Sequence, residues 1–70
     1  MTVTEKSHLN DNYYITLDVE EGRYGFYYEV QVCPRISENE CGYPVRRMAY
    51  HMGDRTKALA TYKRYIKKYV

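Results

Sequence analysis

Hydrophobic and polar residues alternate along positions 13–20 of the chain, with apolar side chains at the odd positions. Because successive side chains of a β-strand point to opposite faces of a sheet, this alternation predicts a half-buried strand. A second alternating segment covers positions 24–33, and Gly22 in the turn between them is free to adopt a positive φ. The two segments therefore predict an antiparallel hairpin. Its apolar face consists of Tyr13, Ile15, Leu17, Val19, Tyr24, Phe26, Tyr28, Val30 and Val32.

Pro34 is expected to end the second strand, and a mostly polar loop follows as far as Gly42. Residues 45–52 predict a third strand with two alternative inward sets. We favour Met48, Tyr50 and Met52 over Val45 and Ala49 because they are larger. Residues 1–11 show no period and are expected to form a flexible N-terminal arm.

Apolar residues recur every three or four positions after Asp54, a good helix N-cap, and this spacing predicts a C-terminal helix. The apolar stripe is Ala58, Leu59, Tyr62, Tyr65, Ile66 and Tyr69. Short connections favour one α+β domain over residues 12–70, in which a three-stranded antiparallel meander is covered on one face by this helix. The predicted core is Leu17, Val19, Phe26, Tyr28, Val30, Leu59, Tyr62 and Ile66.

Ten tyrosines among 70 residues, with one phenylalanine and no tryptophan, point toward recognition, since tyrosine serves both cores and binding surfaces. A chain of this length is near the lower limit for a self-sufficient core, so an enzyme with a deep pocket is not expected. The sequence shows no nucleophile elbow, no phosphate-binding glycine loop and no cysteine and histidine spacing typical of zinc sites. We therefore predict a binding protein without enzymatic activity, metal or cofactor.

The formal charge of +2 hides a division along the chain. Residues 1–42 contain three bases and eight acids, whereas residues 43–70 contain eight bases and Asp54 as the one acid. No segment is typical of a membrane span or a signal peptide, so the expected location is the cytoplasm. In that compartment Cys33 and Cys41 are predicted to be free thiols, although their spacing also fits a disulfide across the base of a hairpin.

Two charged surfaces are candidate binding sites. The first is an acidic, tyrosine-rich sheet face that would suit a basic groove of a protein partner. Its predicted residues are Tyr14, Asp18, Glu20, Glu21, Tyr27 and Glu29. The alternative is a nucleic-acid site on the basic C-terminal segment, at Arg46, Arg47, Lys63, Arg64, Lys67 and Lys68. Either surface could also be a solvated face with no partner.

The tyrosine-rich strands NYYITLDVE and RYGFYYEVQV, together with the short helix DRTKALATYKRYIKKY, resemble the small phage-encoded anti-CRISPR proteins in size and style over residues 12–70. This resemblance implies a compact inhibitor, a monomer or a weak dimer, that covers a surface of a CRISPR effector where target DNA binds. It further implies that Asp18, Glu20, Glu21 and Glu29 imitate phosphate charge against a lysine- and arginine-rich groove of a Cascade-type complex.

Overall fold

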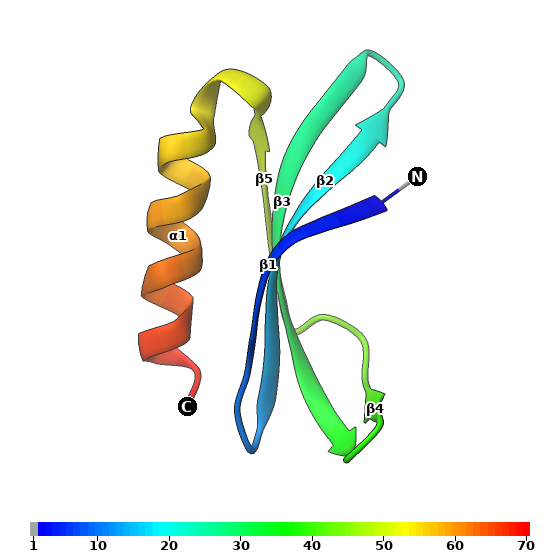
Figure 1. The fold of residues 1–70 in the computed structure, drawn as a ribbon, viewed down its shortest axis with the longest axis vertical. Coiled ribbons are helices and arrows are strands. Elements are labelled where there is room, and N and C mark those ends of the chain that lie inside the picture. Colours follow the sequence, from blue (N-terminus) through cyan, green and yellow to red (C-terminus); the bar gives the residue numbers. More distant parts are fainter. Residues whose placement is uncertain (1) are drawn as a thin grey trace.

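The protein, described over residues 2–70 by a computed structural model, is an antiparallel sheet with one C-terminal helix (Figure 1). The predicted α+β class and the C-terminal helix are confirmed, but the sheet has more strands than the three predicted. The elements are β1 (Thr2–Leu9), β2 (Tyr13–Gly22), β3 (Gly25–Ser37), β4 (Glu40–Cys41), β5 (Arg46–His51), a 3-10 turn (Met52–Asp54) and α1 (Arg55–Lys68). β1, β2 and β3 are successive neighbours, and β5 and β4 pair with different parts of β3.

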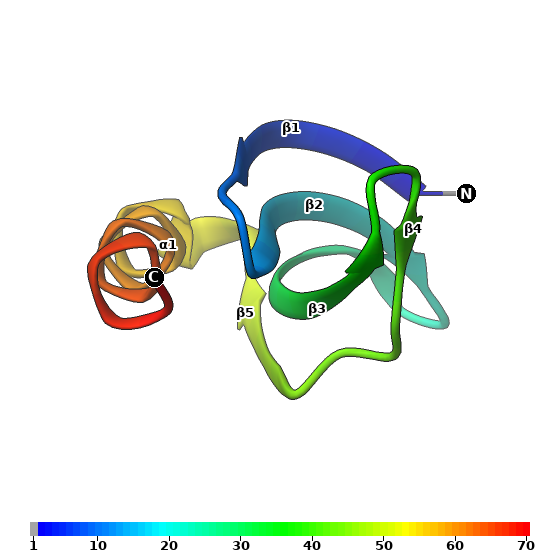
Figure 2. The same cartoon turned by 90° about the horizontal axis from the view of Figure 1, so that it is seen from below.

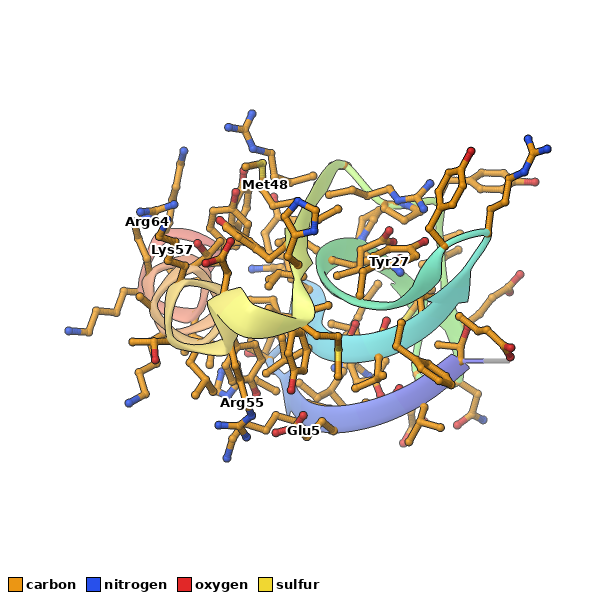
Figure 3. The ribbon with its side chains drawn as sticks, turned by 90° about the horizontal axis from the view of Figure 1, so that it is seen from above. Glu5, Tyr27, Met48, Arg55, Lys57 and Arg64 are labelled. Carbon is orange, nitrogen blue, oxygen red and sulfur yellow. The ribbon has the colours of Figure 1, made fainter. Side chains whose placement is uncertain are left out.

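The N-terminal residues form strand β1 rather than a mobile arm. β1 pairs antiparallel with β2, and its register shifts between Thr4 and Lys6. Glu5 lies at this bulge and forms an ion pair with Arg55, the first residue of α1 (Figure 3). A bulge adds a residue to one strand and breaks its two-residue period. The alternation that identifies a strand is therefore lost in this segment. Met1 lies outside the described residues.

Asn10 holds the turn between β1 and β2. Its side-chain oxygen accepts hydrogen bonds from the backbone N–H groups of Asn12, at 2.9 Å, and Tyr13, at 2.7 Å. Its side-chain nitrogen donates to the carbonyl oxygen of Tyr69 at 2.8 Å. The backbone carbonyl of Asn10 accepts a further hydrogen bond from Arg35 at 2.9 Å. One residue thus joins the first turn to β3 and to the end of α1.

The turn between β2 and β3 places its positive φ at Gly25, not at Gly22 as predicted. Gly22 and Gly25 pair with each other, and Arg23 and Tyr24 form the two-residue turn between them. Gly25 has a φ of 121°. Side chains with a Cβ rarely adopt this conformation, so glycine is required at that position.

Replacing Gly25 with alanine is expected to lower the free energy of unfolding by about 1–3 kcal/mol, because alanine is strained at this φ. Gly53→Ala is the matched control, since Gly53 has no positive φ and an added Cβ would meet no atom within 4 Å. We expect that control to be neutral or slightly stabilising. Urea denaturation followed by tyrosine fluorescence would measure both variants, and equal losses would contradict the proposed strain at Gly25.

β3 continues through Pro34 to Ser37, although Pro34 was predicted to end it. The N–H of Arg35 donates to the carbonyl oxygen of Asn12 on the β2 side, at 2.9 Å. Adjacent residues of a strand direct their backbone groups to opposite sides, so the nitrogen of Pro34 faces β4 instead. There its carbonyl accepts a hydrogen bond from Gly42 at 2.8 Å. The missing N–H therefore breaks no bond between β2 and β3.

The hydrophobic core lies between the sheet and α1. Its buried residues are Ile15, Leu17, Tyr28, Val30, Val32, Ala58, Tyr62 and Tyr65, and Val19, Leu59, Ile66 and Tyr69 pack against them. The predicted apolar stripe of the helix is confirmed. Within residues 2–70, no helix is long and apolar enough to cross a membrane.

Expectations for Tyr24, Phe26, Met52 and Asp54 need correction. Tyr24, predicted to belong to the apolar face, lies in the turn between β2 and β3 and is 95% exposed. Phe26 is 55% exposed because the β2–β3 hairpin tip leans away from α1 (Figure 1). Met48 and Tyr50 pack against the core as favoured, but Met52 lies in the 3-10 turn and is exposed. Asp54 occupies the N-cap position of α1 without a capping hydrogen bond from its side chain.

Candidate functional site

The sheet face opposite α1, predicted to be exposed and acidic, is instead curved and partly buried. Figure 1 shows the β2–β3 hairpin tip and β4 on the side of the sheet away from α1, and Figure 2 shows how strongly β1, β2 and β3 curl. As a result, Asp18 is 5% exposed and Glu29 is 4% exposed, and Thr16 is also buried. The expectation that Asp18 and Glu29 point into solvent is wrong, because strand curvature encloses this face without a covering helix.

The side chain of Asp18 accepts hydrogen bonds from uncharged donor groups. Its carboxylate accepts hydrogen bonds from the hydroxyl groups of Thr4, at 2.9 Å, and Thr16, at 3.1 Å. The side-chain amide of Gln31 donates a third, at 3.2 Å. Within residues 2–70, no cation lies within ion-pair distance of this carboxylate. Asp18 is therefore a buried acidic side chain held by a hydrogen-bond network that spans three strands.

Glu29 lies directly opposite Asp18 across the β2–β3 ladder. Its carboxylate oxygen is 2.9 Å from a terminal guanidinium nitrogen of Arg47 and accepts a hydrogen bond from its Nε at 3.1 Å. The Arg47 side chain is itself 61% exposed. Of these two opposed acids, Glu29 pairs with Arg47, whereas Asp18 has no cationic partner within residues 2–70.

The rim of this face is more accessible than its centre. Glu20 and the two tyrosines, Tyr14 and Tyr27, are half-buried, and the carboxylate of Glu20 accepts a hydrogen bond from Thr2 at 2.7 Å. Of the predicted protein-binding residues, Glu21 alone is exposed, and because it follows Glu20 in β2 its side chain points to the opposite face of the sheet. Figure 3 shows Tyr27 inside the curve of the sheet. Glu20 is therefore the accessible predicted acid at the rim of this face, and the binding role of this surface stays a prediction.

The outward face of α1 is exposed and basic. Lys63, Arg64, Lys67 and Lys68 are all exposed, and none forms an ion pair with any residue in the range 2–70. Arg64 lies on the side of the helix that faces away from the strands (Figure 3). A shallow depression of about 380 Å³ on this face is lined by Ala60, Lys63, Arg64 and Lys67.

Arg46 and Arg47, treated together in the sequence, point to opposite faces of the sheet. The Nε of Arg46 donates to the hydroxyl of Tyr65 on α1 at 3.3 Å, and this hydrogen bond raises the pKa of Arg46. Arg47 instead pairs with Glu29 on the curved face. Arg46 therefore lies on the same side of the sheet as the cations of α1, and Arg47 lies on the opposite side.

Two cations near the C-terminal end of α1 lie over aromatic rings. The sequence analysis did not predict these cation–ring pairs. The guanidinium of Arg64 lies 5.6 Å from the ring centroid of Tyr65, and the ammonium of Lys68 lies 5.6 Å from that of Tyr69. Tyr69 also contacts the rings of Tyr65 and Tyr13 edge-on. The available signal was a basic residue followed by tyrosine, repeated after four positions. Because residues four apart share one helix face, the repeat places two cation–ring pairs together.

Cys33 and Cys41 are free thiols in the structure. Burial raises the pKa of the Cys33 thiol, and the neighbouring Cys41 and Asp18 raise it further. Cys41 is exposed. Within the described part of the chain, no group of histidine, cysteine, aspartate and glutamate residues could hold a metal ion.

We expect iodoacetamide to alkylate Cys41 faster than Cys33 at pH 8. The thiolate is the reactive form, and a raised pKa lowers the thiolate fraction of Cys33 at that pH. The single variants Cys33→Ser and Cys41→Ser isolate each thiol, and mass spectrometry over time gives the two rates. Equal rates would contradict the protected environment of Cys33.

Comparison of the chain with protein-family models, with curated proteins and with solved structures found no match.

Proposed function

We propose that this protein binds nucleic acid by contacting phosphates with the outward face of α1 and with Arg46. The observation that carries this proposal is the set of exposed cations without carboxylate partners within residues 2–70: Arg46, Lys63, Arg64, Lys67 and Lys68. Phosphate contacts of this kind supply affinity that does not depend on base sequence.

The distribution of acids in the fold supports the same proposal. Asp18 and Glu29 lie on the opposite side of the sheet from α1, where they are buried and hydrogen-bonded. The helix itself contains no acidic residue, and its ion pairs within residues 2–70 involve only Arg55 and Lys57 in its first turn, so Lys63, Arg64, Lys67 and Lys68 are not neutralised. An uncompensated positive surface attracts polyanions and accelerates their association. A cytoplasmic location, which is part of the proposal, gives access to such partners.

Fluorescence anisotropy with labelled duplex and single-stranded DNA would test the proposal. About four neutralised phosphates predict an affinity that falls about 100-fold between 50 and 200 mM salt. Binding should show little dependence on base sequence. No anisotropy change at low salt with protein at about 10 μM would contradict the proposal.

Two double variants that each remove two positive charges test whether the DNA-binding site lies on α1. Lys63→Gln combined with Lys67→Gln removes two cations from the α1 depression and is expected to weaken DNA binding about tenfold or more at low salt. Lys6→Gln combined with Arg23→Gln removes two exposed cations from β1 and the hairpin tip. This control should change affinity by less than about threefold, because it alters net charge equally but leaves the phosphate contacts intact. Equal effects would show that only net charge matters.

The curved acidic face supports a second candidate, an occluding inhibitor of the anti-CRISPR kind. Its specific observation is the pair of opposed acids, Asp18 and Glu29, of which only Glu29 pairs with an arginine. In this candidate the buried pair supplies negative potential, while Glu20 and Tyr27 at the rim and Glu21 near the hairpin tip make the contacts. The partner would be a basic, DNA-binding groove of a Cascade-type complex.

An interference assay tests this second candidate. The protein should protect a CRISPR-targeted plasmid from loss, and Glu20→Lys combined with Glu21→Lys should abolish that protection, because both reversals repel a basic groove. Lys63→Gln combined with Lys67→Gln should leave protection unchanged. Loss of protection only in the helix variant would assign the activity to α1 instead.

A further inference from the structure

We infer that Tyr65 is a positioning residue of the nucleic-acid site, because it holds Arg46 of β5 and Arg64 of α1 as a pair of phosphate-contacting cations. This inference rests on the proposed function and deepens it, since it states how two of the cations are arranged. The Nε of Arg46 donates to the hydroxyl of Tyr65 at 3.3 Å. The guanidinium of Arg64 lies 5.6 Å from the centroid of the same ring. A phosphate backbone bound by both cations crosses from β5 to α1.

Tyr65 is a rigid support for the two arginines. It is 2% exposed and belongs to the hydrophobic core between the sheet and α1. Its ring also contacts the ring of Tyr69 edge-on, with the two centroids 5.6 Å apart. Close packing of this kind keeps a buried side chain in one rotamer. The hydroxyl of Tyr65 therefore stays at a fixed place, where Arg46 reaches it from β5.

The hydrogen bond between Arg46 and Tyr65 serves both side chains. A buried tyrosine hydroxyl usually has a hydrogen-bond partner, because leaving it without one is costly. Within residues 2–70, this bond is the only side-chain hydrogen bond of either residue. The position of the Arg46 guanidinium is therefore set by Tyr65.

The absence of charge on Tyr65 distinguishes Arg46 from the next residue, Arg47. Arg47 is held by the carboxylate of Glu29 at 2.9 Å, and this carboxylate balances its charge. A hydroxyl group or an aromatic ring orients a guanidinium without adding a negative charge. Within residues 2–70, Arg46 and Arg64 are thus oriented but not neutralised. Oriented, uncompensated guanidinium groups are suited to phosphate oxygens.

Orienting the arginines before binding makes binding stronger. A free arginine side chain loses rotamer freedom when it contacts a phosphate, and this loss opposes binding. Contact with Tyr65 removes part of that freedom in the unbound protein. The entropic penalty of binding is then smaller, which is the general benefit of a preorganised site.

Tyr65 acts through the arginines and not through contact with bases. Bases stack on aromatic rings that are accessible at a binding surface. The ring of Tyr65 is buried, so it offers no such surface. The contribution of its hydroxyl to affinity should therefore be the same for DNA of different base sequence.

A double-mutant cycle, measured by fluorescence anisotropy with labelled duplex DNA at low salt, tests the inference. Arg46→Gln is expected to weaken binding about fivefold, because a phosphate contact is lost. Tyr65→Phe keeps the ring that Arg64 contacts and removes only the hydroxyl, so we expect binding to be about threefold weaker. In the Arg46→Gln background, Tyr65→Phe should change affinity by less than about 1.5-fold, because the side chain that it positions is gone.

Tyr50→Phe is the matched control. The hydroxyl of Tyr50 is hydrogen-bonded to that of Thr61, so this bond also joins β5 to α1 but involves no cation. Its loss should change DNA affinity by less than about 1.5-fold. Equal effects of Tyr50→Phe and Tyr65→Phe would overturn the inference, since they would show that both hydroxyl groups act by docking the helix. An effect of Tyr65→Phe that persists without Arg46 would overturn it as well.

Nuclear magnetic resonance without nucleic acid separates failure of this inference from failure of the proposed function. The heteronuclear NOE of the Arg46 Nε–H group reports side-chain motion on the ps–ns timescale. We expect a high value in the unaltered protein and in Tyr50→Phe, and a low value in Tyr65→Phe. A low value in the unaltered protein would overturn the inference whatever the DNA affinity is. A high value combined with no DNA binding at low salt would overturn the proposed function and, with it, the phosphate-contacting role of the pair.

Discussion

Asp18→Lys is expected to unfold the protein or to lower its free energy of unfolding by about 3–5 kcal/mol. Asp18 is buried, and its carboxylate accepts hydrogen bonds from Thr4, Thr16 and Gln31. A lysine would bury an uncompensated charge and leave these donors without an acceptor. A domain of 70 residues has a total stability of about 4–10 kcal/mol, so this loss is a large part of the whole.

Glu21→Lys is the matched control for this reversal. Glu21 is three residues away on the same strand, is exposed and forms no ion pair within residues 2–70. Its reversal should change the free energy of unfolding by less than about 0.5 kcal/mol. Urea denaturation of both variants measures the two changes in the free energy of unfolding. A stable, cooperatively folded Asp18→Lys protein would show that the curved face opens to solvent.

Leu17→Ala is expected to cost about 2–5 kcal/mol, because Leu17 is fully buried at the centre of the core. The chain contains three leucines, and each lies at a different depth. Leu59 is half-buried on α1, and Leu9 on β1 is 56% exposed. Removing the same atoms from each position therefore isolates the effect of burial.

The three leucine-to-alanine variants should follow the order of burial. We expect Leu59→Ala to cost less than about 2 kcal/mol and Leu9→Ala less than about 0.5 kcal/mol. Guanidinium chloride denaturation, analysed with a common slope, gives the three values. A cost at Leu59 as large as that at Leu17 would mean that α1 packs more deeply on the sheet than the structure shows.

The sequence pattern predicted the elements whose periodicity is unbroken. The alternation around Leu17 and the three- and four-residue spacing around Tyr62 identified β2 and α1 and placed their buried faces correctly. β1 was missed because the bulge near Glu5 interrupts its alternation. The extension of β3 was missed because the effect of Pro34 depends on which neighbour its nitrogen faces, and sequence does not show this.

The candidate sites could be predicted less well than the fold. Alternation placed Asp18 and Glu29 on the correct side of the sheet, opposite the helix, but it does not determine whether that side is solvated. Strand curl decides this, and curl depends on all the strands together. The basic residues of α1 were found because helical spacing alone sets their position. Strand alternation also separates Arg46 from Arg47, but the partner of Arg47, Glu29, became clear only from the pairing of β5 with β3.

The long-range contacts of α1 have a consequence for the order of folding during synthesis. Asn10 bonds to Tyr69, 59 positions later, and Glu5 pairs with Arg55, 50 positions later. Translation produces the helix after the strands, so a ribosome-bound chain can form its strand hairpins while Leu17 and Val30 still lack a cover. The apolar face of the nascent sheet therefore stays accessible to chaperones until α1 has left the exit tunnel.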